Sequence, residues 1–256
     1  MILDIAQKVL RLPPFPFNNN RLLEGLVLYA PLWHERTHLN GAMKSPFLTL
    51  DRYHHSCTVT GTTLTRLASG IDVPTLDGDD LINCGNPQAI IDAKTELSGW
   101  AWIKVTGTGA DYCIMSKNSF NAKRCWFFRF ERLSNSSKLK FYTSENGTSA
   151  ENVLSTTQLT STSLFYFVGF RYKFVGAATS LASIIINGVE DNSATNMRGD
   201  LYTENGVNVL VGAEYNASDV PSVYMVGNIP EVGLVNRYLS IPTFEQIYQA
   251  TKWRYQ

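Results

Sequence analysis

Apolar and polar residues alternate along much of this chain with a period of two, the pattern of β-strands that bury one face and expose the other. The alternation is clearest at residues 97–105 and 124–132, and residues 163–172 are predicted to be a further long strand. Shorter segments are also predicted to be strands: 25–32, 56–61, 64–68, 73–84, 112–117, 138–144, 181–186, 208–212 and 224–240. Roughly a dozen strands without a regular alternation of strands and helices indicate an all-β antiparallel β-sandwich.

Local signals add one hairpin and one helix to this pattern. The Asn-Gly dipeptide at 187–188 lies between apolar residues and predicts a two-residue hairpin turn. Ser240 is a suitable helix N-cap and Pro242 suits an early helix position. Phe244, Ile247, Tyr248 and Thr251 then recur at intervals of three and four residues, which places them on one face of a helix. We expect one short C-terminal helix that lies over a sheet edge or over the open end of the sandwich.

Residues 1–24 differ from the rest and are interpreted as an extended N-terminal arm, whereas residues 25–256 form one sandwich domain. Three prolines and two phenylalanines fall within five positions of the arm: Pro13, Pro14, Phe15, Pro16 and Phe17. Proline favours extended backbone, and alternate phenylalanines are unfavourable in water. The arm is either a disordered leader or a segment that docks on a partner, and the phenylalanines favour docking.

Composition narrows the classes of partner. The chain has 22 basic and 22 acidic residues among 256, and only 17% of its residues are charged. Nucleic acid and membrane surfaces are excluded as main partners, because binding them requires a clustered basic excess and none is present. No apolar run reaches the roughly 18 residues of a membrane-spanning helix, and the N-terminus lacks the pattern of a secretory signal. We therefore expect a protein that is made in the cytoplasm.

Cysteine and histidine residues do not form a metal-binding pattern. The four cysteines lack the C-x-x-C spacing of zinc sites, so buried free thiols are expected at Cys57, Cys84, Cys113 and Cys125. A disulfide between Cys113 and Cys125 is the alternative, because the two flank a predicted hairpin at 118–123. The histidines at 34, 38, 54 and 55 fit no regular spacing on one element and are expected to be solvated loop residues.

Catalytic motifs are missing, so no catalytic residue is predicted and the chain is not expected to be an enzyme. A glycosidase of this architecture would present two acids on one strand face, as in Glu-x-Asp-x-Glu, and no such triplet is present. Asp77, Asp79 and Asp80 fall in a tight turn, where short acids bond to their own backbone. Neither a nucleophile elbow nor a phosphate-binding glycine loop occurs.

Two places carry residues suited to contact a glycan. Trp126 lies on the strand at 124–132, and Tyr215, Asn216 and Asp219 share a predicted loop. Aromatic rings offer apolar faces against which sugar rings can stack. For Trp126 a place inside the sandwich is the stronger interpretation, because aromatic residues at a period of two usually form the inner face.

Several motifs, taken in order, resemble the LamG-like (laminin G type) family of concanavalin A-like lectin/glucanase jelly rolls. They are the opening strand at 25–32, the Leu-Asp-Gly-Asp-Asp segment at 76–80, the Trp-containing strand at 97–104, the Asn-Gly hairpin at 186–189, and the closing strand and helix from 227. The resemblance covers residues 25–252 and implies a jelly-roll sandwich. It also implies glycan binding, which is frequent among LamG-like domains, although the same sandwich carries glycoside hydrolases and lyases.

The chain departs from the family's pattern at a position linked to calcium. Pro230 stands where the family usually has aspartate, whereas Glu231 is kept. The loop after the first strand also lacks the usual Asp-x-Ser-Gly-Asn run. We therefore predict no cofactor and no metal ligand, with Ca²⁺ as the weaker alternative.

Taken together, these features predict a non-enzymatic structural or adhesive protein of a virus particle, such as a bacteriophage capsid decoration or an exposed head or tail protein. The arm would join it to other virion proteins or to copies of itself in a homo-oligomer. The basis is the missing signal, the arm and the low-charge surface. A carbohydrate-binding module that recognises a cell-surface glycan is the alternative, and a glycoside hydrolase or lyase is a remote one.

Overall fold

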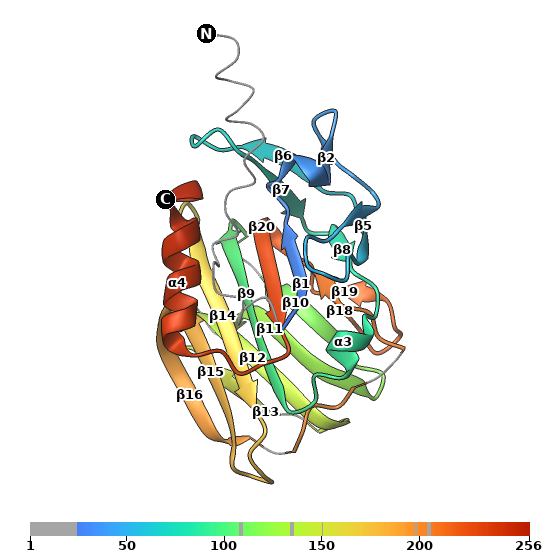
Figure 1. Ribbon diagram of the computed structural model, residues 1–256, viewed down its shortest axis with the longest axis vertical. Helices are drawn as coiled ribbons and strands as arrows, with labels where there is room; N and C mark the ends of the chain where they lie inside the picture. The colour runs from blue at the N-terminus through green and yellow to red at the C-terminus, as the bar shows by residue number, and fades with distance from the viewer. Residues whose placement is uncertain (1–24, 108–109, 134–135, 150, 198, 204–205) are drawn as a thin grey trace.

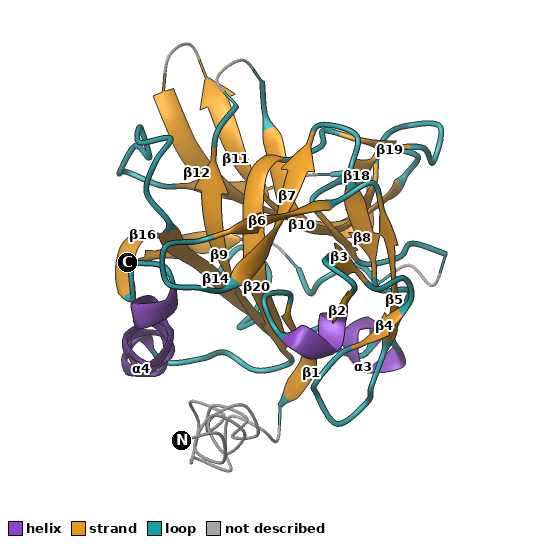
Figure 2. Cartoon of the chain, turned by 90° about the horizontal axis from the view of Figure 1, so that it is seen from above, coloured by secondary structure: helices purple, strands orange, loops and turns teal. Residues whose placement is uncertain are grey.

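The protein is a sandwich of two β-sheets with one long helix packed outside it (Figures 1 and 2). A computed structural model describes residues 25–107, 110–133, 136–149, 151–197, 199–203 and 206–256. The arm residues Pro13 to Phe17 therefore lie outside the described residues. The all-β antiparallel sandwich predicted from the period of two is confirmed.

The first sheet has eight strands, all paired in antiparallel fashion. The closing strand β20 lies near its centre, where it pairs with β1, β7 and β9. In spatial order the strands are β16 (Val189–Met197), β15 (Ser180–Ile186), β14 (Tyr166–Lys173), β9 (Glu96–Val105), β20 (Val226–Val235), β7 (Asp72–Asp77) and β6 (Thr63–Arg66), with β1 (Leu26–Pro31) on β20.

The second sheet has ten strands. Its pairing is antiparallel apart from one parallel bridge between Ser119 and Tyr215. In spatial order the strands are β13 (Glu151–Leu154), β12 (Ser136–Gly147), β11 (Lys123–Leu133), β10 (Tyr112–Ser119), β17 (Leu210–Val211), β8 (Leu81–Asn83), β5 (Ser56–Thr60) and β4 (Phe47–Leu48), with β18 (Glu214–Tyr215) on β10 and β19 (Pro221–Ser222) on β18.

Aromatic side chains from both sheets fill the space between them. Phe170 of the first sheet stacks on Phe141 of the second with ring centres 4.2 Å apart, and Trp126 lies 5.6 Å from the same ring. Full burial of a large apolar side chain stabilises a fold by about 1.5–3 kcal/mol, so this cluster is a main source of cohesion between the sheets. The inward-facing set on β11 is the one that the alternation predicted.

A second apolar layer covers the outer face of the eight-stranded sheet. Trp100, Trp102 and Phe167 point away from the sandwich and pack with Phe244 and Ile247 of helix α4 (Ile241–Thr251). The Ser240 side chain accepts a hydrogen bond from the Thr243 backbone, as its predicted capping role requires.

Helix α4 packs on the outer face of the eight-stranded sheet at its edge strand β16, so the expected position over a sheet edge is confirmed. Close approach to β14 is possible because residue 169 is glycine: a Cβ atom there would come within 2.9 Å of the Phe244 ring. Figure 1 shows the helix running beside β14 to β16.

The turn at 78–80 carries the chain from one sheet to the other. The predicted strand at 73–84 is in fact two strands, β7 in the first sheet and β8 in the second. Within the turn, the Asp80 carboxylate accepts a hydrogen bond from the Asp77 backbone N–H at 2.8 Å. The predicted Asn187-Gly188 hairpin is confirmed between β15 and β16.

Side-chain hydrogen bonds join the two sheets along one edge of the sandwich. The Asp191 carboxylate of β16 accepts hydrogen bonds from the backbone of Thr156 and Thr157, which follow β13. Beside it, the Asn192 amide donates to the Leu154 carbonyl at 2.7 Å. The outer strands β16 and β13 are therefore linked across the edge of the sandwich.

Three short helices complete the described fold: η1 (Glu35–Thr37), α3 (Gln88–Ile91) and η2 (Lys252–Arg254). A two-stranded ribbon of β2 (His38–Leu39) and β3 (Ala42–Met43) follows η1. None of the helices in the described ranges is both long and apolar enough to cross a membrane.

All four cysteines are buried free thiols, as predicted. The disulfide alternative does not hold, because Cys113 lies opposite Arg129 and not opposite Cys125. Burial raises the pKa of the Cys113 thiol, which keeps it protonated and unreactive.

Candidate functional site

The outer face of the ten-stranded sheet carries a group of charged side chains that contact one another. Residues of β11 that alternate with the core aromatics, Phe127, Arg129 and Glu131, point to this face together with Lys140 and Tyr142 of β12. Phe127 stacks on Tyr142 with ring centres 4.3 Å apart, and the Arg129 guanidinium lies 4.6 Å above Phe127. An aromatic pair thus supports the central cation.

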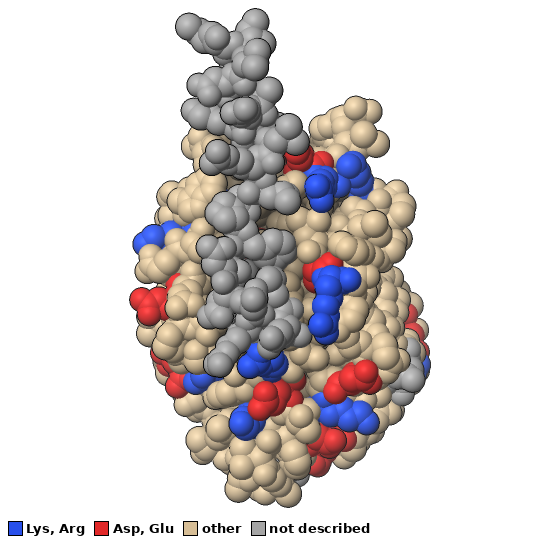
Figure 3. Space-filling model, viewed as in Figure 1, with Lys and Arg blue, Asp and Glu red and all other residues tan. Residues whose placement is uncertain are grey.

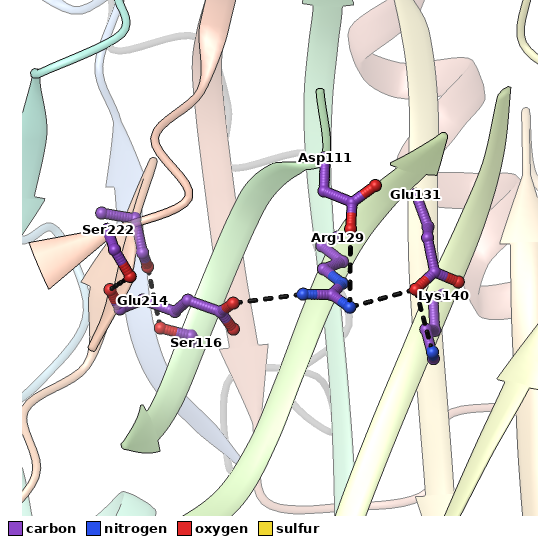
Figure 4. A network of polar contacts seen from close by, with 8 residues as sticks. Asp111, Ser116, Arg129, Glu131, Lys140, Glu214 and Ser222 are labelled. Carbon is purple, nitrogen blue, oxygen red and sulfur yellow. Dashed lines mark hydrogen bonds and ion pairs between the residues drawn. The ribbon is translucent and has the colours of Figure 1, made fainter. Parts of the chain in front are cut away.

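Arg129 joins three carboxylates from distant parts of the chain (Figure 4). Its Nη1 donates to Glu214 at 3.2 Å, and its Nη2 donates to Glu131 at 3.0 Å and lies 3.7 Å from Asp111. Lys140 contacts the same Glu131 oxygen at 3.0 Å. We refer to these five residues as the Arg129 network.

The Arg129 network contains two buried carboxylates and is incompletely paired. Glu214 is fully buried and Glu131 is 5% exposed. Within the described part of the chain, the second carboxylate oxygen of each and the Nε of Arg129 have no hydrogen-bond partner. Three acids face two bases, and burial raises the pKa of Glu214 to about 7 although Arg129 opposes the shift.

This raised pKa predicts that stability falls as pH increases. The unfolded Glu214 ionises near 4.5 and the folded one near 7. Between these pH values the folded state binds the proton more tightly, so the free energy of unfolding decreases by about 3 kcal/mol from pH 4.5 to pH 8 through this residue. Glu214→Gln should remove that part of the decline, which urea unfolding at pH 5, 6, 7 and 8 measures. Parallel curves for the two proteins would contradict the assignment.

An exposed rim borders the network at one end of β10. We define the rim as the β10–β11 turn, residues 119–124, and the β18–β19 connection, residues 215–220. Asp219 joins its two halves, because its carboxylate accepts hydrogen bonds from Ser119 Oγ at 2.5 Å, Asn121 Nδ2 at 3.1 Å and Lys123 Nζ at 3.1 Å. These donors lower the pKa of Asp219 to about 2, so it stays anionic at ordinary pH.

The structure brings three of the four predicted glycan contacts together. Tyr215, Asn216 and Asp219 all belong to the rim, where the Asn216 side chain accepts from the backbone of residues 218 and 220. Trp126 is instead 2% exposed between the sheets. The packing interpretation therefore fits Trp126, and it takes no part in the site described here.

The four loop histidines do not converge, and the expectation that they are solvated is wrong for His34, which is buried. His38, His54 and His55 each contact a different backbone carbonyl, and His34 accepts from the Arg36 backbone. Among the described residues, Asp77, Asp79 and Asp80 place carboxylate oxygens within 4.8 Å of one another. The Asp80 carboxylate bonds to the backbone of its own turn, as predicted, and the expectation of no metal, with Ca²⁺ as the weaker alternative, stays a prediction.

Sequence reasoning did not identify the Arg129 network. Arg129 and Glu131 were visible as the outward positions of a strand with an aromatic inner face. Glu214 gave no local signal, because it lies 85 residues away in sequence. Asp111 precedes β10 and likewise shows its relation to Arg129 only in the folded chain.

Comparisons with known proteins agree with this architecture. A family model described as the concanavalin A-like lectin/glucanases superfamily matches residues 76–242. A search of curated protein sequences finds no match.

Solved structures match over most of the chain. Domain 4 of AbnA, an extracellular arabinanase from Geobacillus stearothermophilus solved with arabinotriose, has a TM-score of 0.64 at 13% identity, over 88% of this chain and 98% of that one. A structure of botulinum neurotoxin type C, which depends on interaction with two ganglioside molecules to enter cells, has a TM-score of 0.62 at 12% identity over 90% of this chain. The binding domain of Paraclostridial Mosquitocidal Protein 1 has a TM-score of 0.62 at 12% identity over 89% of this chain. The present chain spans about half the length of both toxin chains, 52% in each case.

Proposed function

The chain belongs to the concanavalin A-like lectin/glucanases superfamily, and from that premise we propose that it is a non-enzymatic, lectin-type protein that binds a carbohydrate at its rim. The observation that carries the proposal is Asp219, an exposed carboxylate held in place by three donors from the neighbouring turn. A polar group that is fixed before binding loses little conformational freedom when a ligand arrives.

The rim has the chemistry that a sugar requires. Sugar hydroxyls donate to carboxylates and accept from amide and ammonium groups, which Asp219, Asn121 and Lys123 supply. The half-buried rings of Phe120 and Tyr215 lie in the same two segments, and the Phe120 backbone N–H contacts the Tyr215 carbonyl at 3.4 Å. The rim therefore offers both kinds of contact that a pyranose or furanose can make: stacking against the apolar face of the ring and hydrogen bonds to its hydroxyl groups.

The comparisons support the proposal through the fold. At 12–13% identity they carry no residue across, but a domain of nearly the same length as this chain has been solved with a trisaccharide. On the face that Figure 3 shows, acidic and basic side chains are interspersed among uncharged ones.

Catalysis by the Arg129 network is not proposed. A glycosidase needs one carboxyl group to donate a proton and the other to attack or to activate water. Here Arg129 lies between Glu131 and Glu214 and holds one oxygen of each. Both second oxygens are closed to solvent, so a scissile bond cannot reach them in this conformation.

The test is a glycan array followed by calorimetric titration of each hit. We expect at least one neutral oligosaccharide to bind and to be recovered uncleaved. Asp219→Asn should weaken that binding by about tenfold or more, because one acceptor is lost while the donors remain. Asparagine tolerates the positive φ of 56° at this position, so the loop should keep its shape.

Asp72→Asn is the matched control. Asp72 is also an accessible acid in an ion pair, with Arg66 at 2.9 Å, but it belongs to the β6–β7 hairpin. Its replacement should leave glycan affinity unchanged. Equal loss in both variants, or no hit at millimolar sugar, would count against the rim as a glycan site.

The finer assignment to a bacteriophage particle stays a prediction. It depends on the composition and on residues 1–24, which lie outside the described part of the chain. A carbohydrate-binding sandwich is compatible with an adhesive role in such a particle, and residues of the rim do not favour one setting over another.

A further inference from the structure

A surface cavity lies at the edge of the ten-stranded sheet, away from the rim. Its volume is about 520 Å³, within the range of sites that hold small molecules. Residues of η1, of edge strand β4 and of the loop that follows β4 line it. Strands β17, β8 and β5 separate β4 from β10, so at about 4.8 Å per strand β4 and β10 are about 19 Å apart across the sheet.

Basic side chains line this cavity without an acidic one. Arg36, Lys44 and His54 contribute to its wall. In the described ranges, neither Arg36 nor Lys44 forms an ion pair with a carboxylate. The Nδ1 of His54 lies 3.2 Å from the Thr49 carbonyl, which makes Nδ1 the donor and leaves Nε2 for another partner.

Apart from Thr49, the other residues that line the cavity are apolar. Pro46, Phe47 and Leu48 line the cavity, and Leu48 is 57% exposed although it belongs to a strand. An exposed leucine on an edge strand is unfavourable in water and favours pairing with other chains. Its position beside two cations without carboxylate partners suits a ligand that has an acid group and an apolar side.

The loop that carries His54 is held rigidly. Buried Asp51 accepts hydrogen bonds from the backbone N–H groups of Tyr29 and Tyr53, both at 2.9 Å. The Thr49 hydroxyl accepts from the His55 backbone at 2.8 Å. The loop backbone on this side of the cavity is therefore held in place before any ligand binds, which lowers the entropic cost of binding there.

We infer that this cavity binds a small carboxylate ligand, with the acid group between Arg36 and Lys44 and the apolar side against Leu48. The carboxylate can belong to an acidic sugar residue or to a short aliphatic acid, since both present the same group. This site is independent of the glycan site at the rim and does not require it.

Nuclear magnetic resonance titration of the full-length chain tests the inference. The probes are glucuronic acid, N-acetylneuraminic acid and hexanoate, with glucose and hexan-1-ol as neutral counterparts. We expect saturable shifts at the backbone amides of Leu48, Thr49 and His54 with at least one acid, weaker in 300 mM than in 20 mM NaCl because the charges are partly exposed. If only the sugar acids bind, the ligand class is an acidic sugar. If hexanoate binds as well, the cavity recognises any carboxylate that has an apolar side.

Substitutions separate this site from general charge attraction. The double variant R36Q/K44Q should lose at least about tenfold in affinity, since two charge-assisted contacts disappear. Arg52→Gln is the matched control: Arg52 lies on the same loop, but its guanidinium is engaged with the Tyr53 ring, 4.7 Å away. The inference is overturned if no acid binds, if the neutral probes bind equally well, or if R52Q loses as much affinity as R36Q/K44Q.

Discussion

Arg129→Leu is expected to lower the free energy of unfolding by about 3–5 kcal/mol at pH 8, the usual cost of removing one partner of a buried ion pair. Arg129 pairs with Glu214, Glu131 and Asp111, and without it the fully buried Glu214 has no cation in contact. Glu131 keeps Lys140, so most of the loss should come from Glu214. Chemical unfolding monitored by tryptophan fluorescence measures the change.

Two further variants decide whether the charge is the cause. Arg124→Leu removes another arginine of β11, one that lies 4.9 Å from the Phe120 ring and donates to the Thr148 carbonyl, and it should cost about 1 kcal/mol or less. The double variant R129L/E214L should recover part of the stability lost in R129L, because it leaves no unpaired carboxylate at position 214. A double variant less stable than R129L would show that lost packing, and not the unpaired charge, dominates.

Arg254→Met should produce a loss of similar size, about 3–5 kcal/mol, at the opposite face of the molecule. Arg254 of η2 is 2% exposed and contacts Glu231 of β20 at 3.3 Å. Tyr255 donates to the same carboxylate at 3.1 Å, and Trp33 donates at 3.3 Å. Burial already raises the pKa of Glu231 and Arg254 lowers it, so removing the cation leaves a buried acid with neutral donors only.

The loss in R254M should therefore depend on pH. The loss of unfolding free energy should be largest above pH 7, because there the folded R254M must either bury an unpaired Glu231 carboxylate or keep it protonated while the unfolded residue is ionised. It should be smaller near pH 4, where the unfolded residue is also protonated. Lys252→Met provides the control, because Lys252 lies 5.5 Å from the Tyr248 ring and has no contact with Glu231. A pH-independent loss in R254M would contradict the role assigned to the ion pair.

The sequence predicts most strands of this fold because one face of each is buried, and burial imposes a period of two. The break within 73–84 was not predicted as a change of sheet, because a turn signal does not specify which strands its flanking segments will join. The position of helix α4 also depends on distant residues. Its own sequence shows that Phe244 must be buried, but only the folded sheet shows that Gly169 makes room for it.

Of the candidate sites, too, one part could be predicted from the sequence and another part depends on the fold. Tyr215, Asn216 and Asp219 could be singled out because polar and aromatic residues share one loop. The hydrogen bond from Ser119 to Asp219 joins residues 100 positions apart in the sequence. It forms only because the parallel bridge between β10 and β18 brings the two segments together. The cavity beside β4 had no sequence signal, since Arg36, Lys44 and Leu48 become neighbours only when β3 and β4 fold back on η1.

The hydrogen-bonded edge between β13 and β16 affects how the protein can associate with copies of itself. Amyloid-like growth begins where a sheet offers unpaired backbone groups to a strand of another molecule. At this side, the backbone N–H groups of Thr156 and Thr157 and the Leu154 carbonyl are already bonded to side chains of the same molecule. An incoming strand would first have to displace those side chains, so these three backbone groups are closed to pairing with another molecule while the protein stays folded.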